Sequence, residues 1–350
     1  TSADTLKTAA AAYAELNSSA GSYQTWKNTV NAGTGLIGGR FSLDARLSQI
    51  TSDGYVDRAA SNLKSFFLSG GVYGKKSLLR ANVFSGTEKT YQAWNGVPES
   101  LLATNRTYNG FTYEDQTDNY TQDHYQLLYS SSISPALNFN GALHYTAGRG
   151  YYEEFKEDAE LAAYGISPVI IGTTTVDNSN LVRRRWLKND FYGLTYSLNY
   201  HPSGGVNVTL GGAYNEYDGD HFGEVIWAQY ASDSNIRHRY YQGNGFKTDF
   251  NIFGRAEYSP GRLGLFTDLQ FRAVGYTVSG TDKNRNPLDV DASLRFFNPK
   301  FGLTYELGPG ADIYASYAVG SKEPNRDDYI NSTAATRPRA EKLHNVEAGY

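Results

Sequence analysis

Aromatic rings and arginines gather in the long polar segments of this sequence. A ring can stack against a ligand or hold a cation, and a guanidinium binds carboxylate or catecholate oxygens. Together they predict a surface that binds a small molecule carrying such groups. The alternative is that the rings pack against neighbouring loops and the arginines bind lipid phosphates. The residues expected to contact ligand are Tyr91, Trp94, Arg184, Trp186, Arg237, Arg239 and Tyr240.

A weaker signal concerns metal binding. Asp218 and Asp220 flank a glycine and place oxygen ligands at a spacing that suits Ca²⁺, but the surrounding pattern is not a full calcium loop. A solvated acidic turn in a long loop explains them better. Cysteine is absent and the six histidines show no paired spacing, which argues against zinc. We therefore expect no metal and no cofactor.

Nucleophilic catalysis is the third chemistry to weigh. His144 together with Ser130 or Ser132 on a neighbouring strand supplies two members of a Ser-His-Asp hydrolase. Serine is common here, however, and no third group stands out. We expect a protein that is not an enzyme.

The composition narrows the class of protein. The 350 residues include 36 acidic and 32 basic side chains, and the net charge of −4 argues against nucleic-acid binding. No apolar run is long enough for a transmembrane helix. The 29 tyrosines and 36 glycines of a chain that is polar on average indicate a fold built from many strands.

Apolar and polar residues alternate along most of the chain. Between 190 and 201 a tyrosine or leucine occupies every second position, which predicts a strand with one apolar face. The segment 169–176 is apolar inside a loop, so we expect a strand-like extension or hairpin there, and residues 8–12 could begin a helix. The fourteen expected strands are 11–20, 23–36, 40–52, 61–73, 77–88, 121–132, 136–149, 190–201, 205–217, 246–258, 262–277, 293–306, 311–321 and 342–350.

The connections between these strands indicate the architecture. Short Gly- or Pro-rich turns alternate with long polar loops, and the long loops are expected at 53–60, 89–120, 150–189, 218–245, 278–292 and 322–341. A transmembrane β-barrel has this order, with short turns on one side of the membrane and long loops on the other. A soluble β-sandwich is the alternative, but charged residues in mid-strand on the polar face fit a wet lumen better. We predict an all-β, antiparallel transmembrane barrel.

Two late segments resemble a known family. Residues 316–326, Ser-Tyr-Ala-Val-Gly-Ser-Lys-Glu-Pro-Asn-Arg, and residues 337–350, which begin Arg-Pro-Arg-Ala-Glu-Lys-Leu, resemble a late-barrel signature of TonB-dependent outer-membrane receptors. The segment 21–26 looks like the first barrel hairpin of that family. Residues 53–55 and 89–94 are similar to loop pieces of siderophore-type receptors from Bacteroidetes.

The resemblance implies an N-terminal plug inside a barrel of about 22 strands. With fourteen expected strands and no plug, residues 1–350 look like a barrel portion that stops before the last strands. It also implies uptake of a scarce solute, first of all a ferric siderophore, across the bacterial outer membrane. The partners would be outer-membrane lipid and, through the plug, the TonB complex. The alternatives are a passive porin and, less favoured, a barrel hydrolase. The lumen residues expected to face the plug are Arg255, Glu257, Asp268 and Arg272.

Overall fold

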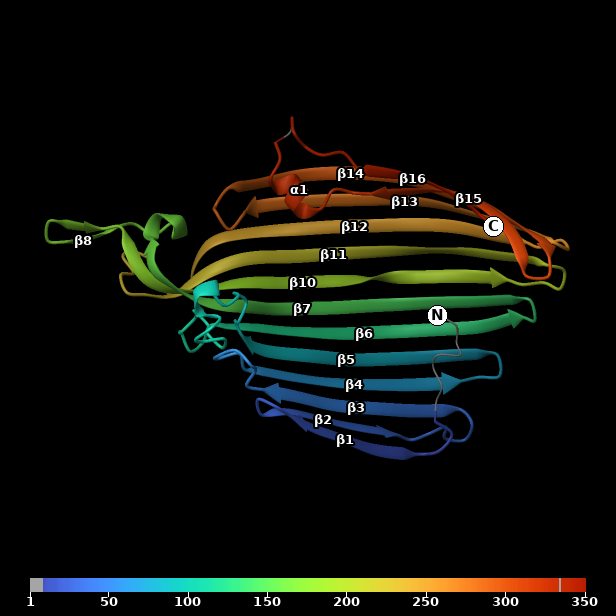
Figure 1. Ribbon diagram of the computed structural model, residues 1–350, viewed down its shortest axis with the longest axis horizontal. Coiled ribbons are helices and arrows are strands. Elements are labelled where there is room, and N and C mark those ends of the chain that lie inside the picture. The colour runs from blue at the N-terminus through green and yellow to red at the C-terminus, as the bar shows by residue number, and fades with distance from the viewer. Residues whose placement is uncertain (1–8, 334) are drawn as a thin grey trace.

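The computed structural model describes residues 9–333 and 335–350, which form one antiparallel sheet of fourteen strands in chain order (Figure 1). Each expected strand is present, and the all-β prediction is confirmed. The strands are β1 (Tyr13–Gly21), β2 (Thr25–Gly33), β3 (Phe41–Ser52), β4 (Ser61–Tyr73), β5 (Ser77–Tyr91), β6 (Thr117–Ser134), β7 (Leu137–Glu160), β10 (Asn178–Tyr200), β11 (Val206–Ala228), β12 (His238–Tyr258), β13 (Leu263–Thr281), β14 (Pro287–Gly308), β15 (Ala311–Lys322) and β16 (Glu341–Gly349).

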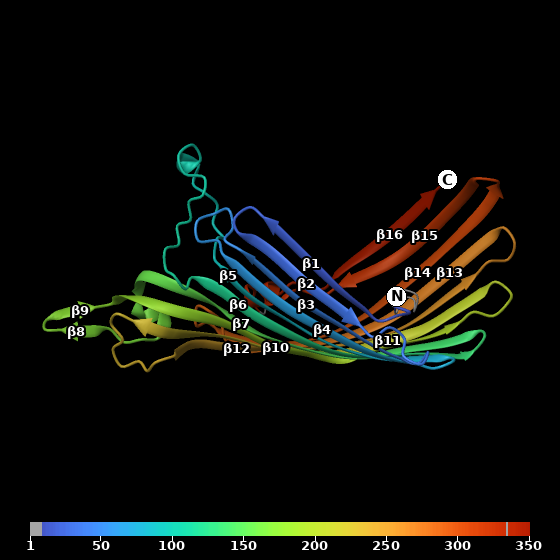
Figure 2. The same ribbon diagram turned by 90° about the horizontal axis from the view of Figure 1, so that it is seen from below.

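The sheet curls into a trough whose two edges are β1 and β16 (Figure 2). In the described part of the chain β1 pairs with β2 and β16 with β15, so the barrel is not closed. The curvature brings distant strands together on one face. Glu323, just after β15, reaches Lys247 on β12 across the two intervening strands. That face is therefore the concave one.

The convex face carries the apolar set of the alternating pattern. Leu143 is 55% exposed and Leu210 52% exposed, although both lie in the middle of long strands. Tyr192, Leu194 and Tyr196 are exposed on the same face instead of being buried between two layers. A single sheet that turns its apolar side chains outward suits a lipid environment rather than a sandwich core. No helix among the described residues is long and apolar enough to cross a membrane.

Tyrosine hydroxyls mark the loop-side edge of this apolar band. Tyr192 and Tyr214 both donate to Glu216, and Tyr145 donates to Asp190 at 2.5 Å. A ring in hydrocarbon with its hydroxyl on a polar group is typical of a membrane interface. Residues beyond these tyrosines stand above the band.

The strands continue far past that edge, and here the sequence-based boundaries were wrong. β10 and β11 each have 23 residues, so much of the expected loops 150–189 and 218–245 is sheet, as is part of 278–292. Cross-strand hydrogen bonds use the backbone and need no apolar side chains. A criterion based on apolar alternation therefore stopped each strand at the edge of the band.

Few other elements interrupt the sheet. The predicted hairpin is confirmed, because β8 (Val169–Ile171) pairs with β9 (Thr174–Val176) beyond the end of the wall. Residues 9–12 form no helix, and residue 8 lies outside the described residues. The remaining elements are two 3₁₀ turns, η2 (Glu99–Leu101) and η3 (Leu161–Tyr164), and the short helix α1 (Arg326–Ile330).

Candidate functional site

Consecutive residues of β10 place their side chains on opposite faces of the sheet. Side chains of a strand alternate between faces, and Arg184 and Trp186 share the parity of Tyr192. They therefore lie on the convex face, and Arg185 lies on the concave one. Trp186 is six positions beyond Tyr192, about 20 Å along the strand at roughly 3.3 Å per residue. These groups belong to strands above the apolar band, not to a loop as predicted.

On the convex face, rings and arginines form a ladder across β7, β10, β11 and β12. The Arg184 guanidinium lies 4.4 Å from the centre of the Tyr151 ring, and Tyr151 contacts Trp186 at 4.5 Å. Trp186 stacks on Phe222 at 5.7 Å, and Arg239 covers Phe222 at 4.2 Å. We call these five residues the outer ladder. Cation–π and ring stacking contacts hold its members to one another.

Two buried glutamates complete the outer ladder. Glu153 accepts from Nε of Arg184 at 2.7 Å and from the Tyr113 hydroxyl at 2.7 Å. Glu224 accepts from Nε1 of Trp186 at 2.9 Å. The hydrogen-bonding groups of Arg184 and Trp186 are thus engaged within the wall. For these two predicted ligand residues, the structure shows contacts with neighbouring strands on the face turned away from the lumen.

On the concave face of the same strands, Arg185 has a different environment. Its Nη1 donates to the Tyr152 hydroxyl at 2.9 Å and its Nε to the Tyr240 hydroxyl at 3.3 Å. Tyr241 contacts Tyr240 edge to face at 5.0 Å, and Trp94 contacts Tyr152 edge to face at 5.6 Å. We call these five residues the inner cluster. Two of its aromatic residues bond the Arg185 guanidinium, and the other two pack against those rings.

The inner cluster differs from its neighbours in charge. Arg183 pairs with Glu154 at 2.8 Å and Arg184 with Glu153, but in the described part of the chain no carboxylate lies within ion-pair distance of Arg185. Burial alone would lower the pKa of Arg185, yet its bonds to the Tyr152 and Tyr240 hydroxyls outweigh that effect and raise it. Arg185 therefore keeps a full positive charge that no acidic side chain neutralises.

A small apolar core holds the inner cluster in place. Leu161 and Tyr164 of η3, with Ile166, Leu181 and Val225, bury their side chains against the rings of the cluster. Burial raises the pKa of the Tyr240 and Tyr241 hydroxyls, which stay neutral. Packing against this core therefore holds the rings of Tyr240 and Tyr241 in place.

Glycine permits this packing at one position. Gly223 of β11 lies under the rings of Tyr240 and Tyr241, and a Cβ atom there would clash with both. The rings can reach the wall because this residue has no side chain.

The other predicted ligand residues are dispersed. The Tyr91 hydroxyl donates to the Tyr113 carbonyl at 2.6 Å and so fixes the loop after β5. Trp94, 57% exposed, belongs to the inner cluster, and Arg237 is an exposed loop residue before β12. Of the seven predicted residues, Trp94 and Tyr240 lie in the inner cluster, and Arg184, Trp186 and Arg239 lie in the outer ladder.

The acidic pair expected in a loop lies instead within β11. Asp218 and Asp220 are on the convex face, where both accept from Nδ2 of Asn244, at 2.6 and 2.9 Å. The loop placement is therefore corrected. Across the described residues, no group of three or more His, Cys, Asp or Glu side chains is arranged to hold a metal ion.

The polar residues expected in the lumen do lie on the concave face. Arg255 pairs with Glu257 and stands opposite Asp268 in the sheet register. Arg272 pairs with Asp249 at 2.5 Å and with Glu323 at 2.8 Å. Their contact with a plug stays a prediction.

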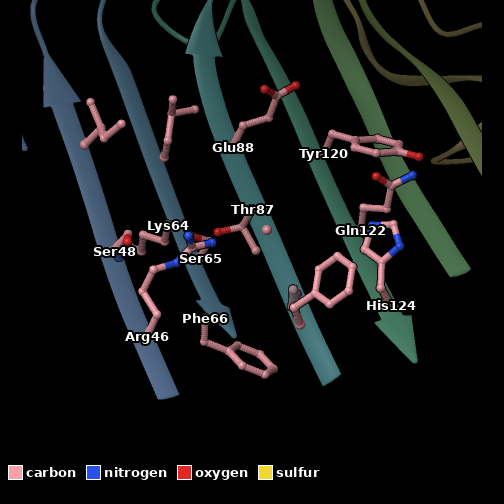
Figure 3. A pocket seen from close by; sticks show the side chains of 15 residues that line it. Arg46, Ser48, Lys64, Ser65, Phe66, Thr87, Glu88, Tyr120, Gln122 and His124 are labelled. Carbon is pink, nitrogen blue, oxygen red and sulfur yellow. The ribbon is translucent and has the colours of Figure 1, made fainter. Parts of the chain in front are cut away.

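The N-terminal half of the concave face is hollowed as well (Figure 3). This hollow lies over β3–β6 and has a volume of about 450 Å³, with Glu88, Tyr120, Gln122 and His124 on its β5–β6 side. The His124 ring stacks on Phe84 at 4.3 Å and bonds the Thr146 hydroxyl at 3.0 Å. Polar and apolar side chains therefore share the lining of this hollow.

The serine–histidine pair considered for hydrolysis is not assembled. Nε2 of His144 bonds Oδ1 of Asn215 at 2.9 Å, while Ser130 donates to Asn140 at 2.8 Å and Ser132 to the Ser134 carbonyl. Each of these hydroxyls has another partner.

A single curved sheet with an apolar outer band, a polar inner face and tall loop-side strands is the structure of an outer-membrane type of β-barrel. The model of one such family, the TonB dependent receptor-like β-barrel, matches residues 54–350. The chain therefore belongs to the TonB-dependent receptor family, in its barrel portion.

Solved structures agree on the fold. The ferric-catecholate import receptor Fiu from E. coli K12, in its closed form, superposes with a TM-score of 0.70 at 13% identity, over 98% of this chain and 56% of its own. The ferric citrate transporter FecA superposes with a TM-score of 0.72 at 10% identity, over 98% of this chain and 49% of its own. The copper transporter OprC superposes with a TM-score of 0.70 at 12% identity, over 98% of this chain and 52% of its own. The chain thus spans about half the length of these structures. No curated protein matches it.

Proposed function

We propose that residues 1–350 are the barrel portion of an outer-membrane importer that takes up a scarce solute, with a ferric siderophore as the cargo. The observation that carries this proposal is the inner cluster, because Arg185 is a cation without an acidic partner among the described residues and bonds two tyrosine hydroxyls on the concave face. It lies above the apolar band, where a solute arriving from outside the cell would first meet the wall.

The charge of the inner cluster supports an anionic chelate as cargo. The similar structures are described as carriers of ferric catecholate, ferric citrate and copper, so the shared fold does not choose among cargoes. A guanidinium attracts the carboxylate or catecholate oxygens of a chelate and repels a bare metal cation. Rigid tyrosine rings add contact area at low entropy cost.

The remaining partners follow from the two faces of the sheet. Outer-membrane lipid would cover the apolar band. A plug in the lumen would contact Arg255, Glu257, Asp268 and Arg272 and would connect the barrel to the TonB complex. Family membership favours this energised import over a passive porin.

The test is uptake of radioactive iron by cells that carry this receptor and lack other iron receptors. Ferric citrate and a ferric catecholate serve as probes, with and without TonB. We expect TonB-dependent uptake of at least one probe. Arg185→Gln should weaken its binding about tenfold or more, since it removes a charge-assisted hydrogen bond.

The matched control is Lys188→Gln, which removes a positive charge three residues away on the convex face. It should leave iron uptake unchanged. Uptake that persists without TonB would indicate a passive channel. Failure of both iron chelates, with the receptor present in the outer membrane, would reject the cargo.

A further inference from the structure

The segment after β15 folds back over the concave face and roofs a cavity of about 360 Å³. The helix α1 within this segment lies beside β13 and β14 (Figure 1). We call residues 323–330 the strap. The cavity has the size of a pocket for a small molecule, and the side chains of β11 to β14 form its walls.

The strap is fastened at both ends. Glu323 accepts from Nζ of Lys247 at 2.6 Å and from Nη1 of Arg272 at 2.8 Å. Burial opposes ionisation of Glu323, but these bonds outweigh it and lower its pKa to about 2. At the other end Tyr329 is buried against Val278, Leu288 and Val290. The roof is thus part of the resting structure.

Arg326 adds a positive charge to the cavity lining that no acidic side chain of the described residues neutralises. Glu323 is paired with Lys247 and Arg272, and the Asp328 carboxylate accepts from the backbone N–H of Asn325 in the capping box of α1. Among the described residues Arg326 has no ion-pair partner, and its buried Nε has no hydrogen-bond acceptor. Burial and the nearby Arg326 lower the pKa of His221 to about 4, so this wall residue is neutral at pH 7.

Tyrosine rings form a large part of the cavity lining near Arg326. Tyr217, Tyr276 and Tyr329 contribute rings, and Val274 lies among them. A guanidinium without an acidic partner in the described part of the chain and tyrosine rings that line the same cavity attract a ligand that is both negatively charged and planar.

We propose that this cavity is a binding site for a small aromatic carboxylate of the benzoate type. The Arg326 guanidinium pairs with the carboxylate, and the rings of Tyr217 and Tyr276 receive the aromatic ring. The site uses other residues than the inner cluster, so it stands whether or not the receptor imports iron chelates.

The test is a ligand-observed NMR titration of the purified receptor in detergent with benzoate. Benzamide tests the need for charge, and cyclohexanecarboxylate tests the need for planarity. We expect benzoate to bind and both analogues to bind at least about tenfold more weakly, as expected for loss of a charge-assisted hydrogen bond or of ring stacking.

Two variants locate the site. Arg326→Gln should weaken benzoate binding about tenfold or more, with partial recovery in Arg326→Lys. Gly245→Val keeps every charge but fills the cavity, because a Cβ there meets only the Tyr276 hydroxyl, at 3.7 Å. It should abolish binding. The matched control is Lys283→Gln, an exposed cation in the β13–β14 turn, which should bind like the wild type.

The proposal is overturned if the wild type does not bind benzoate, if benzamide binds equally well, or if Gly245→Val retains full affinity. Should Arg326→Gln fail to fold, as judged by its thermal unfolding, Gly245→Val decides the location.

Discussion

The outer ladder and the inner cluster lie on opposite faces of the wall, share the strands β7, β10 and β12, and are both built from arginine and aromatic side chains. In the ladder, Arg184 donates a hydrogen bond to the Glu153 carboxylate, and Trp186 donates one to the Glu224 carboxylate. In the cluster, the hydrogen-bond partners of Arg185 are neutral tyrosine hydroxyls. On the convex face the arginine charge is neutralised by a glutamate of a neighbouring strand. On the concave face the positive charge of Arg185 has no acidic partner among the described residues. Consecutive residues of a strand can serve structure and recognition separately.

The largest expected effect comes from breaking the outer ladder at its ion pair. Arg184→Gln leaves the buried Glu153 without its cation, which should cost about 2–4 kcal/mol of unfolding free energy. Chemical denaturation in detergent measures it. Arg185→Gln should cost less than about 1 kcal/mol, because no buried charge loses an opposite partner. Equal losses in the two variants would refute the contrast between the faces.

A smaller effect is expected from Trp186→Phe. The ring still stacks on Phe222, but Glu224 loses the donor that bonds it at 2.9 Å. Loss of a hydrogen bond to a buried carboxylate should cost about 1–2 kcal/mol. Binding of the iron chelate should not change. A weaker chelate affinity in this variant would place the ladder in the recognition surface after all.

Acid should produce the smallest effect. Burial raises the pKa of Glu154, but the charge and hydrogen bond of Arg183 outweigh burial and lower it below 4.5. A lowered pKa stabilises the folded state above the unfolded value of 4.5, and this stabilisation fades as pH falls below it. At pH 4 the loss is at most about 1 kcal/mol. Glu154→Gln should remove this acid-dependent component from the pH profile of unfolding, whereas an unchanged profile would contradict the assignment.

The sequence predicted the sheet well because lipid-facing strands must alternate strictly, as in Tyr192, Leu194 and Tyr196. It failed above the apolar band, where backbone pairing continues without that requirement. Extending the parity of Tyr192 upward would have separated Arg184 from Arg185. Bulges at Val182/Arg183 and Gly223/Glu224 shift the register there, and no local pattern predicts them.

The position of the strap could not be predicted from a single sequence. Glu323 stands within a segment that matched a family signature, yet its bonds to Lys247 and Arg272 connect residues 76 and 51 positions apart. Such contacts depend on the curvature of the whole sheet.

The height of the strands has a consequence for how this surface can change over generations. The β8–β9 hairpin, with Ile170 75% exposed, extends beyond a wall that is hydrogen-bonded on both sides. Loop tips tolerate substitution and insertion far better than paired strands do. Insertions at the tip of this hairpin should therefore leave the pairing of β10 with β7 and β11 intact, and with it the position of Arg185.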